Sequence, residues 1–139
     1  MSTSTRHLIF HAAVVLLFGL MLGGPYARAI KRGAAAQVVN SWRVAHLSLP
    51  LGATLMLATA AVLPMMGVSA GLQWAIAVML IVSAYGFCIA TPLAAITGER
   101  GLSAGAGGLG RLVYLGNWVG AAGSALAAAL FLYAAGVSL

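Results

Sequence analysis

His46 is the residue of this chain best suited to bind a metal or a cofactor. Trp42 and Arg43 precede it and Pro50 follows it. Because proline has no N–H, the carbonyl of His46 loses its usual partner if a helix runs through this segment, whereas His46 lies just outside the helix if that helix begins near residue 48. Either arrangement makes the backbone irregular beside an imidazole, the commonest protein ligand for a metal or a haem iron. Arg43 could then pair with a haem propionate; the alternative is an interfacial histidine that hydrogen-bonds to a neighbour.

A second group of candidate side chains shares one helical face. Ser83, Phe87 and Thr91 follow one another at intervals of four residues, whereas Tyr85 and Cys88 fall on other faces. Hydroxyl groups in an apolar helix either line a site or bond to their own or a neighbouring helix. The pattern leaves both roles open for the two hydroxyls, and the single cysteine is interpreted as a packing residue.

Other chemical arrangements are weak or excluded. His7 and His11 are four residues apart and can chelate zinc, although no carboxylate accompanies them. Glu99 is the only acidic residue, so a carboxylate dyad is impossible. The glycine-rich stretch 105–110 follows an apolar run rather than a strand and lacks the lysine of a phosphate-binding loop, so we interpret it as a flexible loop.

The composition is that of a chain whose solvent is mostly lipid. Hydrophobic residues make up 63% of the 139 residues and charged residues only 6%, against roughly 25% charged residues in a soluble domain. The net charge of +6 does not indicate nucleic-acid binding. The basic residues lie at the ends of apolar runs, where anionic lipid headgroups lie, and no basic patch is interleaved with base-stacking aromatics.

Four apolar runs predict an all-α fold, an integral membrane four-helix transmembrane bundle that forms a single domain over residues 1–139. The expected spans are 7–24, which Pro25 ends, 45–66, 72–96 and 112–135. A polar connector over 26–43, a turn over 67–71 and the loop 98–110 join these spans. Membrane strands are excluded because they would alternate apolar and polar residues over about ten positions.

The distribution of Lys and Arg predicts the orientation in the membrane. The first connector carries four basic residues, and the third loop carries Arg100 with Arg111 at its edge, whereas the amino-terminal tail has only Arg6. By the positive-inside rule these two loops lie in the cytoplasm and both termini lie outside. Small residues near Ala27 and Ala29 would also fit the end of a cleaved signal, but we expect the first apolar run to be retained as a span.

Glycines at four-residue spacing predict close helix packing. Gly19 with Gly23, and Gly116 with Gly120 and then Gly123, let backbones approach one another in lipid. These stripes serve contacts within the bundle or between subunits, and the sequence leaves both open.

The chain resembles the membrane-bound styrene oxide isomerases along most of its length. His7, followed after eight residues by LLFG, is similar to the family's first span, and WRVAH at 42–46 resembles its W-x-R-A-H motif with one residue inserted between Arg43 and Ala45. From His46 onward, further matches fall at the family's spacing without a gap. They are Val62-Leu63-Pro64 with Gly67, and Arg100-Gly101-Leu102 with Gly105 and Gly110.

The resemblance implies a cofactor, an assembly and a reaction. The family implies a trimer of four-helix bundles with haem b near the subunit interface. Its haem histidine corresponds to His46, which is therefore the expected iron ligand, and the motif makes Trp42 and Arg43 the other expected cofactor-binding residues. The implied substrate is a lipophilic epoxide similar to styrene oxide. Ferric iron acts as a Lewis acid on its oxygen, the C–O bond opens toward a carbocation, a hydride shifts and an aldehyde leaves. An apolar cavity would exclude water that could trap the cation, and we expect a homotrimer in the bacterial inner membrane.

Several pocket positions depart from the family. Its asparagine six residues after the histidine corresponds to Gly52, its third-span aspartate to Ser83 and its third-span tyrosine to Thr91, whereas Tyr85 matches in kind the aromatic residue two positions after the aspartate. Ser83, Thr91 and Tyr85 are therefore the candidate catalytic residues. The substitutions predict a smaller and less polar pocket, which takes a different epoxide or serves a haem protein with another function.

Two other functions fit the same sequence. A non-catalytic or electron-transfer haem protein usually has two axial ligands, and His7 or His11 would supply the second. A haem-free transporter subunit or small interaction protein would also have four spans with glycine faces. Against the transporter, no span carries a central charge of the kind that marks an ion pathway.

Overall fold

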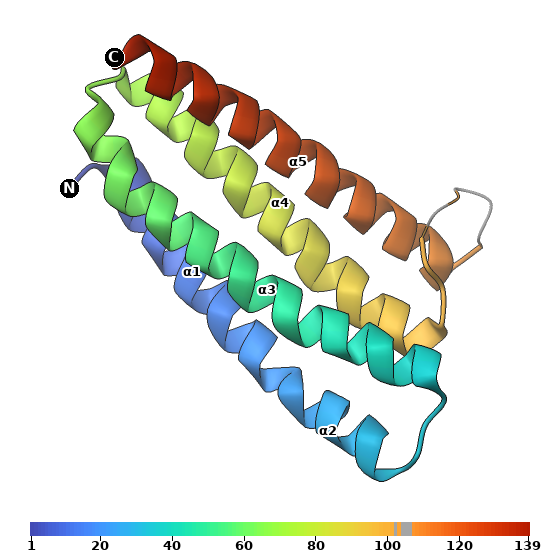
Figure 1. Cartoon of the computed structure of the whole chain (residues 1–139). Coiled ribbons are helices and arrows are strands. Elements are labelled where there is room, and N and C mark those ends of the chain that lie inside the picture. Colours follow the sequence, from blue (N-terminus) through green and yellow to red (C-terminus); the bar gives the residue numbers. More distant parts are fainter. Residues whose placement is uncertain (102, 104–106) are drawn as a thin grey trace.

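The computed structural model describes residues 1–101, 103 and 107–139, and within these residues it contains helices and no strand. The elements are α1 Thr3–Met21, α2 Gly23–Lys31, α3 Ala36–Val62, the 3-10 turn η1 Leu63–Met66, α4 Ala70–Thr97 and α5 Leu109–Val137 (Figure 1). Leu102 and Gly105 of the family resemblance lie outside the described residues, and so do residues 105–106 of the flexible loop predicted over 105–110.

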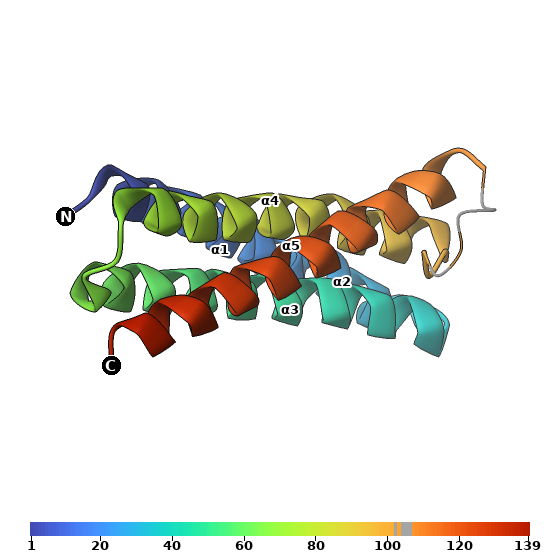
Figure 2. The same cartoon turned by 90° about the horizontal axis from the view of Figure 1, so that it is seen from above.

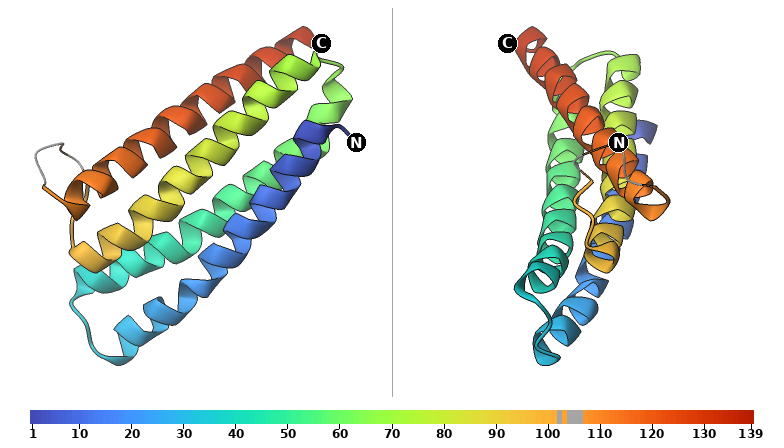
Figure 3. Two further views of the ribbon diagram at one scale, coloured as in Figure 1. Left: turned by 180° about the vertical axis from the view of Figure 1, so that it is seen from behind. Right: turned by 90° about the vertical axis from the view of Figure 1, so that its right-hand side faces the viewer.

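The prediction of an all-α four-helix transmembrane bundle is confirmed. Four helical segments are long and apolar enough to cross a membrane: Thr3–Lys31, Ala36–Met66, Ala70–Thr97 and Leu109–Val137. Helix α1 lies beside α3 and α4 beside α5, and both termini lie at the same end, as an even number of crossings requires (Figure 1). Helix α5 is inclined to α3 and α4 (Figures 2 and 3).

The expected polar connector over 26–43 is wrong in its extent. Helix α2 occupies Gly23–Lys31 and α3 already begins at Ala36, so the non-helical link is only residues 32–35. Pro25 does not end the first span, because it lies in the first turn of α2, where the missing N–H has no helical partner to lose. The first segment therefore reaches Lys31 instead of stopping near residue 24.

Helix α3 runs through His46 and contains Pro50. Of the two arrangements predicted for this segment, the continuous helix is the one observed. The carbonyl of His46 therefore has a proline four residues ahead and no N–H to accept from. Gly19 of α1 makes room for this proline, since an added Cβ there would lie 2.5 Å from Pro50 Cδ and 2.8 Å from Leu49 Cβ.

Capping residues fix the ends of α4. The Ser69 hydroxyl accepts a hydrogen bond from the N–H of Leu72 at 3.3 Å, and Gly98 ends the helix with φ 74°, a left-handed conformation that favours glycine. Gly67 follows η1 with φ 65°. The turn predicted over 67–71 is thus confirmed, with residues 67–69 as its non-helical part.

Glycines bring α4 and α5 into backbone contact. A Cβ at Gly86 would lie 2.8 Å from the Gly116 carbonyl oxygen, and a Cβ at Gly116 would lie 2.8 Å from the Gly86 carbonyl oxygen. Gly123 approaches the Met79 carbonyl in the same way, at 3.1 Å. The predicted glycine stripes therefore pack within the bundle.

Candidate functional site

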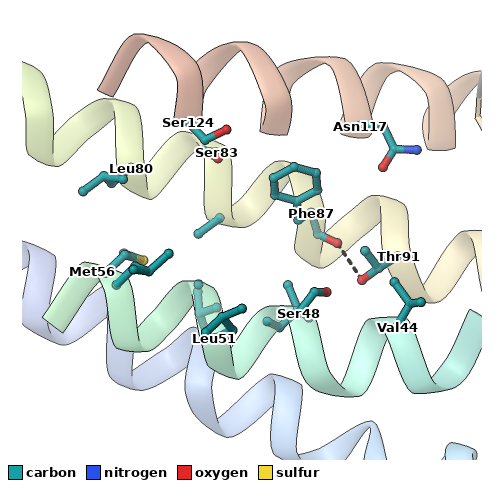
Figure 4. A pocket seen from close by; sticks show the side chains of 15 residues that line it. Val44, Ser48, Leu51, Met56, Leu80, Ser83, Phe87, Thr91, Asn117 and Ser124 are labelled. Carbon is teal, nitrogen blue, oxygen red and sulfur yellow. Dashed lines mark hydrogen bonds between the residues drawn. The ribbon is translucent and has the colours of Figure 1, made fainter. Parts of the chain in front are cut away.

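A cavity of about 410 Å³ lies between α3, α4 and α5, with Val15 of α1 in its wall. Most of its lining is aliphatic, and Phe87 adds one aromatic ring (Figure 4). The polar side chains that line it are Ser48, Ser83, Thr91, Asn117 and Ser124. Such a volume falls within the range of about 300–1,000 Å³ that is usual for small-molecule sites.

The cavity brings together the three positions at which the resemblance places pocket groups. Gly52, Ser83 and Thr91 all line it, and the spacing of four residues does place Phe87 on the same face as the two hydroxyls. The Ser83 hydroxyl donates to the Gly120 carbonyl at 2.6 Å, and the Thr91 hydroxyl donates to the Phe87 carbonyl at 2.9 Å (Figure 4). Because both hydroxyl protons are already donated to carbonyls, these side chains present hydrogen-bond acceptors to the cavity and no free proton.

The ring of Phe87 fits the wall because α5 carries a glycine opposite it. A Cβ at Gly120 would lie 2.7 Å from Phe87 Cζ. The ring is thereby packed against the α5 backbone, and it is the aromatic surface available to a ligand in the cavity. Aromatic faces attract cations.

His46 lies on a different side of α3 from the cavity. Its Nδ1 is 3.0 Å from the Gly19 carbonyl oxygen, and because a carbonyl only accepts, Nδ1 carries the proton and Nε2 has the free lone pair. The absence of a side chain at Gly23 makes room for the ring, since a Cβ there would lie 3.0 Å from His46 Cε1. The ring of Tyr26 is tilted against it at 6.1 Å between centroids. Donation of one ring N–H to a backbone carbonyl is the usual arrangement of a metal-binding histidine.

The side chains of Trp42 and Arg43 have different surroundings. Trp42 packs on the apolar cluster that includes Leu22 and Ala45, at the contact of α1 with α3. Arg43 is exposed, and its guanidinium donates to Asn40 Oδ1 at 2.5 Å. Their predicted contact with a cofactor stays a prediction.

Tyr85 lies outside the cavity. Its hydroxyl is 2.8 Å from His11 Nδ1, and the two rings meet edge to face at 5.6 Å. His7 stacks on His11 with centroids 6.1 Å apart and also contacts Trp74. The catalytic role predicted for Tyr85 stays a prediction, which the activity of Tyr85→Phe would test.

In the described part of the chain, no cluster of three or more His, Cys, Asp or Glu side chains forms a metal site. A zinc site at His7 and His11 would therefore have only two protein ligands. A single imidazole with a free Nε2, as at His46, instead suits one axial position of a haem.

Sequence reasoning missed Ser48, Asn117 and Ser124 as lining residues. Asn117 and Ser124 are seven residues apart on α5 and thus on one face, which is a signal that the sequence does contain. Ser48 lies four residues after Val44, which also lines the cavity. These signals were weak because isolated polar residues in apolar helices often bond only to their own backbone.

The comparison with known protein families gives one match that covers nearly the whole chain. The family described as styrene oxide isomerase matches residues 4–136. No curated protein matches the chain significantly. The matched residues include the WRVAH segment and those that line the cavity, and the four apolar helices run through the match. The chain therefore belongs to the styrene oxide isomerase family.

Proposed function

We propose that this protein is a membrane-bound isomerase that converts a lipophilic epoxide, similar to styrene oxide, into an aldehyde, with haem b held by His46. The observation that carries the proposal is the family match over residues 4–136. The apolar cavity between α3, α4 and α5 supports it, because the reaction needs a chamber for a small hydrophobic molecule.

The cavity lining suits ring opening without hydrolysis. Aliphatic side chains such as Met56 and Leu80 exclude water, so a carbocation formed from the substrate rearranges by a hydride shift instead of becoming a diol. The Phe87 ring stabilises positive charge on carbon through its π face. The lone pairs of Ser83 and Thr91 assist, since both hydroxyls have already donated their protons elsewhere.

The residues around His46 fit a haem. The Gly19 carbonyl fixes the imidazole in the tautomer that leaves Nε2 for iron, and Gly23 leaves space beside the ring. Haem b, when bound, supplies a ferric Lewis acid for the epoxide oxygen. The Lewis acid is needed because the hydroxyls at the family's pocket positions, Ser83 and Thr91, have no free proton to give to that oxygen.

A homotrimer in the bacterial inner membrane is part of the proposal. His46 does not line the cavity of its own chain. Val44, Leu51 and Leu55 line the cavity and are also exposed on the outer surface of α3. A neighbouring copy that covers this side would bring its own helices against the cavity, and this supports a site completed between subunits.

The first test is an absorption spectrum of the protein purified in detergent, oxidised and then reduced, followed by assays of aromatic and aliphatic epoxides for aldehyde. We expect a stoichiometric Soret band that His46→Ala abolishes while the helical circular dichroism is retained. His11→Ala is the matched control and should keep the band unchanged.

Full haem in His46→Ala would refute the assignment of the ligand. A Soret shift in His11→Ala would instead favour the electron-transfer alternative with two axial histidines. No band even after hemin is added would exclude haem chemistry for this chain.

A further inference from the structure

A second, polar cavity adjoins the apolar one. It has a volume of about 480 Å³, and it shares Val44, Thr91 and Asn117 with the apolar cavity. Its remaining lining comes mostly from polar side chains: Gln37, Asn40, Ser41 and Arg100. We call this second cavity the polar mouth. In Figure 4, Met56 and Leu80 lie at one end of the apolar cavity and Thr91 and Asn117 lie at the other.

The polar mouth contains one cationic side chain, that of Arg100, which is exposed and whose backbone is bonded to α5. Asn117 Nδ2 donates to the Arg100 carbonyl at 3.4 Å. Gly101 lets the chain pass close to α5 there, since it has φ 61° and an added Cβ would lie 2.8 Å from Asn117 Nδ2. Arg100 is thus tied to the residue at which the two cavities meet. Glu99, the only acidic residue, does not line the mouth.

Most other polar groups of the mouth are already engaged. Gln37 Nε2 donates to the Gly98 carbonyl at 3.4 Å, and the Ser41 hydroxyl donates to the Gln37 carbonyl at 2.9 Å. Arg43 donates to Asn40 Oδ1, which leaves the Asn40 amide as a donor. Within the residues that the structure describes, the Arg100 guanidinium has no protein acceptor, whereas its carbonyl is bonded. Gln37 Oε1 and Asn117 Oδ1 remain as neutral acceptors, so among the described lining residues the Arg100 guanidinium is the one charged group left without a partner.

We propose that the polar mouth is a carboxylate subsite, so that the joined cavities bind an amphiphile whose apolar body fills the chamber and whose carboxylate pairs with Arg100. A guanidinium binds a carboxylate through two parallel hydrogen bonds, and the Asn40 amide adds a neutral donor. The carboxylate belongs to a free amphiphile such as the substrate, or to a haem propionate. The substrate class that follows, an epoxide whose carbon skeleton ends in a carboxylate, rests on the proposed function, whereas the subsite itself does not.

The test measures binding and requires no turnover. The full-length protein in nanodiscs of zwitterionic lipid is titrated by calorimetry with 6-phenylhexanoate and with the uncharged 6-phenylhexan-1-ol, and empty nanodiscs are subtracted. In parallel, hemin and hemin dimethyl ester are titrated by Soret absorbance. The variants are Arg100→Gln, Arg100→Lys and, as a control for net charge, Arg111→Gln, which lies on α5 outside the mouth.

We expect the wild type and Arg111→Gln to prefer the carboxylate over its uncharged partner by about tenfold, the effect of one charge-assisted hydrogen bond. Arg100→Gln should lose this preference, and Arg100→Lys should keep part of it because the charge remains. If the Arg100-dependent preference for the carboxylate is seen with 6-phenylhexanoate, the subsite binds a free amphiphile. If it is seen only with hemin, the subsite binds a propionate.

Equal preferences in the wild type and Arg100→Gln for both ligand pairs would overturn the subsite. Arg100→Lys keeps the test decisive if Arg100→Gln fails to fold, as judged by circular dichroism. A protein that shows the Arg100-dependent preference but isomerises no epoxide would refute the proposed function and leave the subsite intact.

Discussion

Two adjacent glycines at the start of α2 have different surroundings. A Cβ at Gly23 would lie 3.0 Å from His46 Cε1, whereas Gly24 has no atom within 4 Å of an added Cβ. Gly23→Ala should therefore displace the imidazole and weaken hemin binding about tenfold, which corresponds to an overpacking cost of about 1.4 kcal/mol. Hemin titration measures the effect. Gly24→Ala is the matched control, because it gains the same helix propensity without the contact; equal hemin affinity in both variants would contradict the placement of His46.

The aromatic ring in the cavity wall makes a second prediction at the scale of the residue. If Phe87 stabilises positive charge on the substrate, Phe87→Leu should lower kcat for epoxide isomerisation about tenfold while KM changes less, because the ring acts most strongly when the charge develops. Phe87→Tyr keeps the ring and should retain most of the activity. Trp118→Leu removes an exposed aromatic that does not line the cavity and is the control. Unchanged kcat in Phe87→Leu would exclude the ring from catalysis.

At the scale of the residue, the sequence predicted which side chains share a helical face wherever their spacing matched a regular helix. Ser83 and Thr91 were placed on one face by their spacing of eight residues, and both line the cavity. Arg100 could not be placed, because its position over the mouth depends on Gly101 passing close to Asn117, a contact between a loop and a distant helix. Periodicity reports faces within a helix and not which helices meet.

At the scale of the element, the α4–α5 pair depends on backbone contact. Gly86→Ala would place a Cβ 2.8 Å from the Gly116 carbonyl oxygen and 2.9 Å from the Gly120 nitrogen, and neither atom can move without separating the helices. We expect a loss of about 2 kcal/mol in the free energy of unfolding, measured by denaturation in mixed detergent micelles. Gly136→Ala in the same pair has open space around it and should be neutral or slightly stabilising. Equal stability of the two variants would show that the helices do not touch at Gly86.

Element boundaries could be predicted where local chemistry decides them. Ser69 and Gly98 cap α4, whose bounds Ala70–Thr97 lie within two residues of the predicted span 72–96. The first boundary was wrong because Pro25 was interpreted as a stop, although the same residue is tolerated in a first helical turn. For the same reason the basic segment was interpreted as a connector, whereas Arg28 and Lys31 belong to the last turn of α2, where positive charge is favourable.

For the whole molecule, the distribution of charge predicts the orientation. All basic residues except Arg6 lie in α2 or directly after it, in the first part of α3, or around the α4–α5 connection, near one end of the bundle (Figure 1). Each Lys or Arg near an anionic cytoplasmic leaflet contributes roughly 1 kcal/mol of attraction. This end should therefore face the cytoplasm, and the two termini should lie outside.

The orientation also decides from which compartment the polar mouth is reached, because Arg100 lies at the basic end. Single cysteines at exposed Ala35 and exposed Ser138, introduced after Cys88→Ala, report the two ends. A membrane-impermeant maleimide added to spheroplasts should label Ser138→Cys and leave Ala35→Cys unmodified, whereas inverted vesicles should give the opposite pattern. The reverse result would put the mouth outside the cell, and a carboxylate amphiphile would then reach Arg100 without crossing the bilayer. Labelling of both cysteines from one side would mean that the chain inserts in two orientations. The excess of basic residues at one end would then be too small to fix the orientation of a bundle with so few charges.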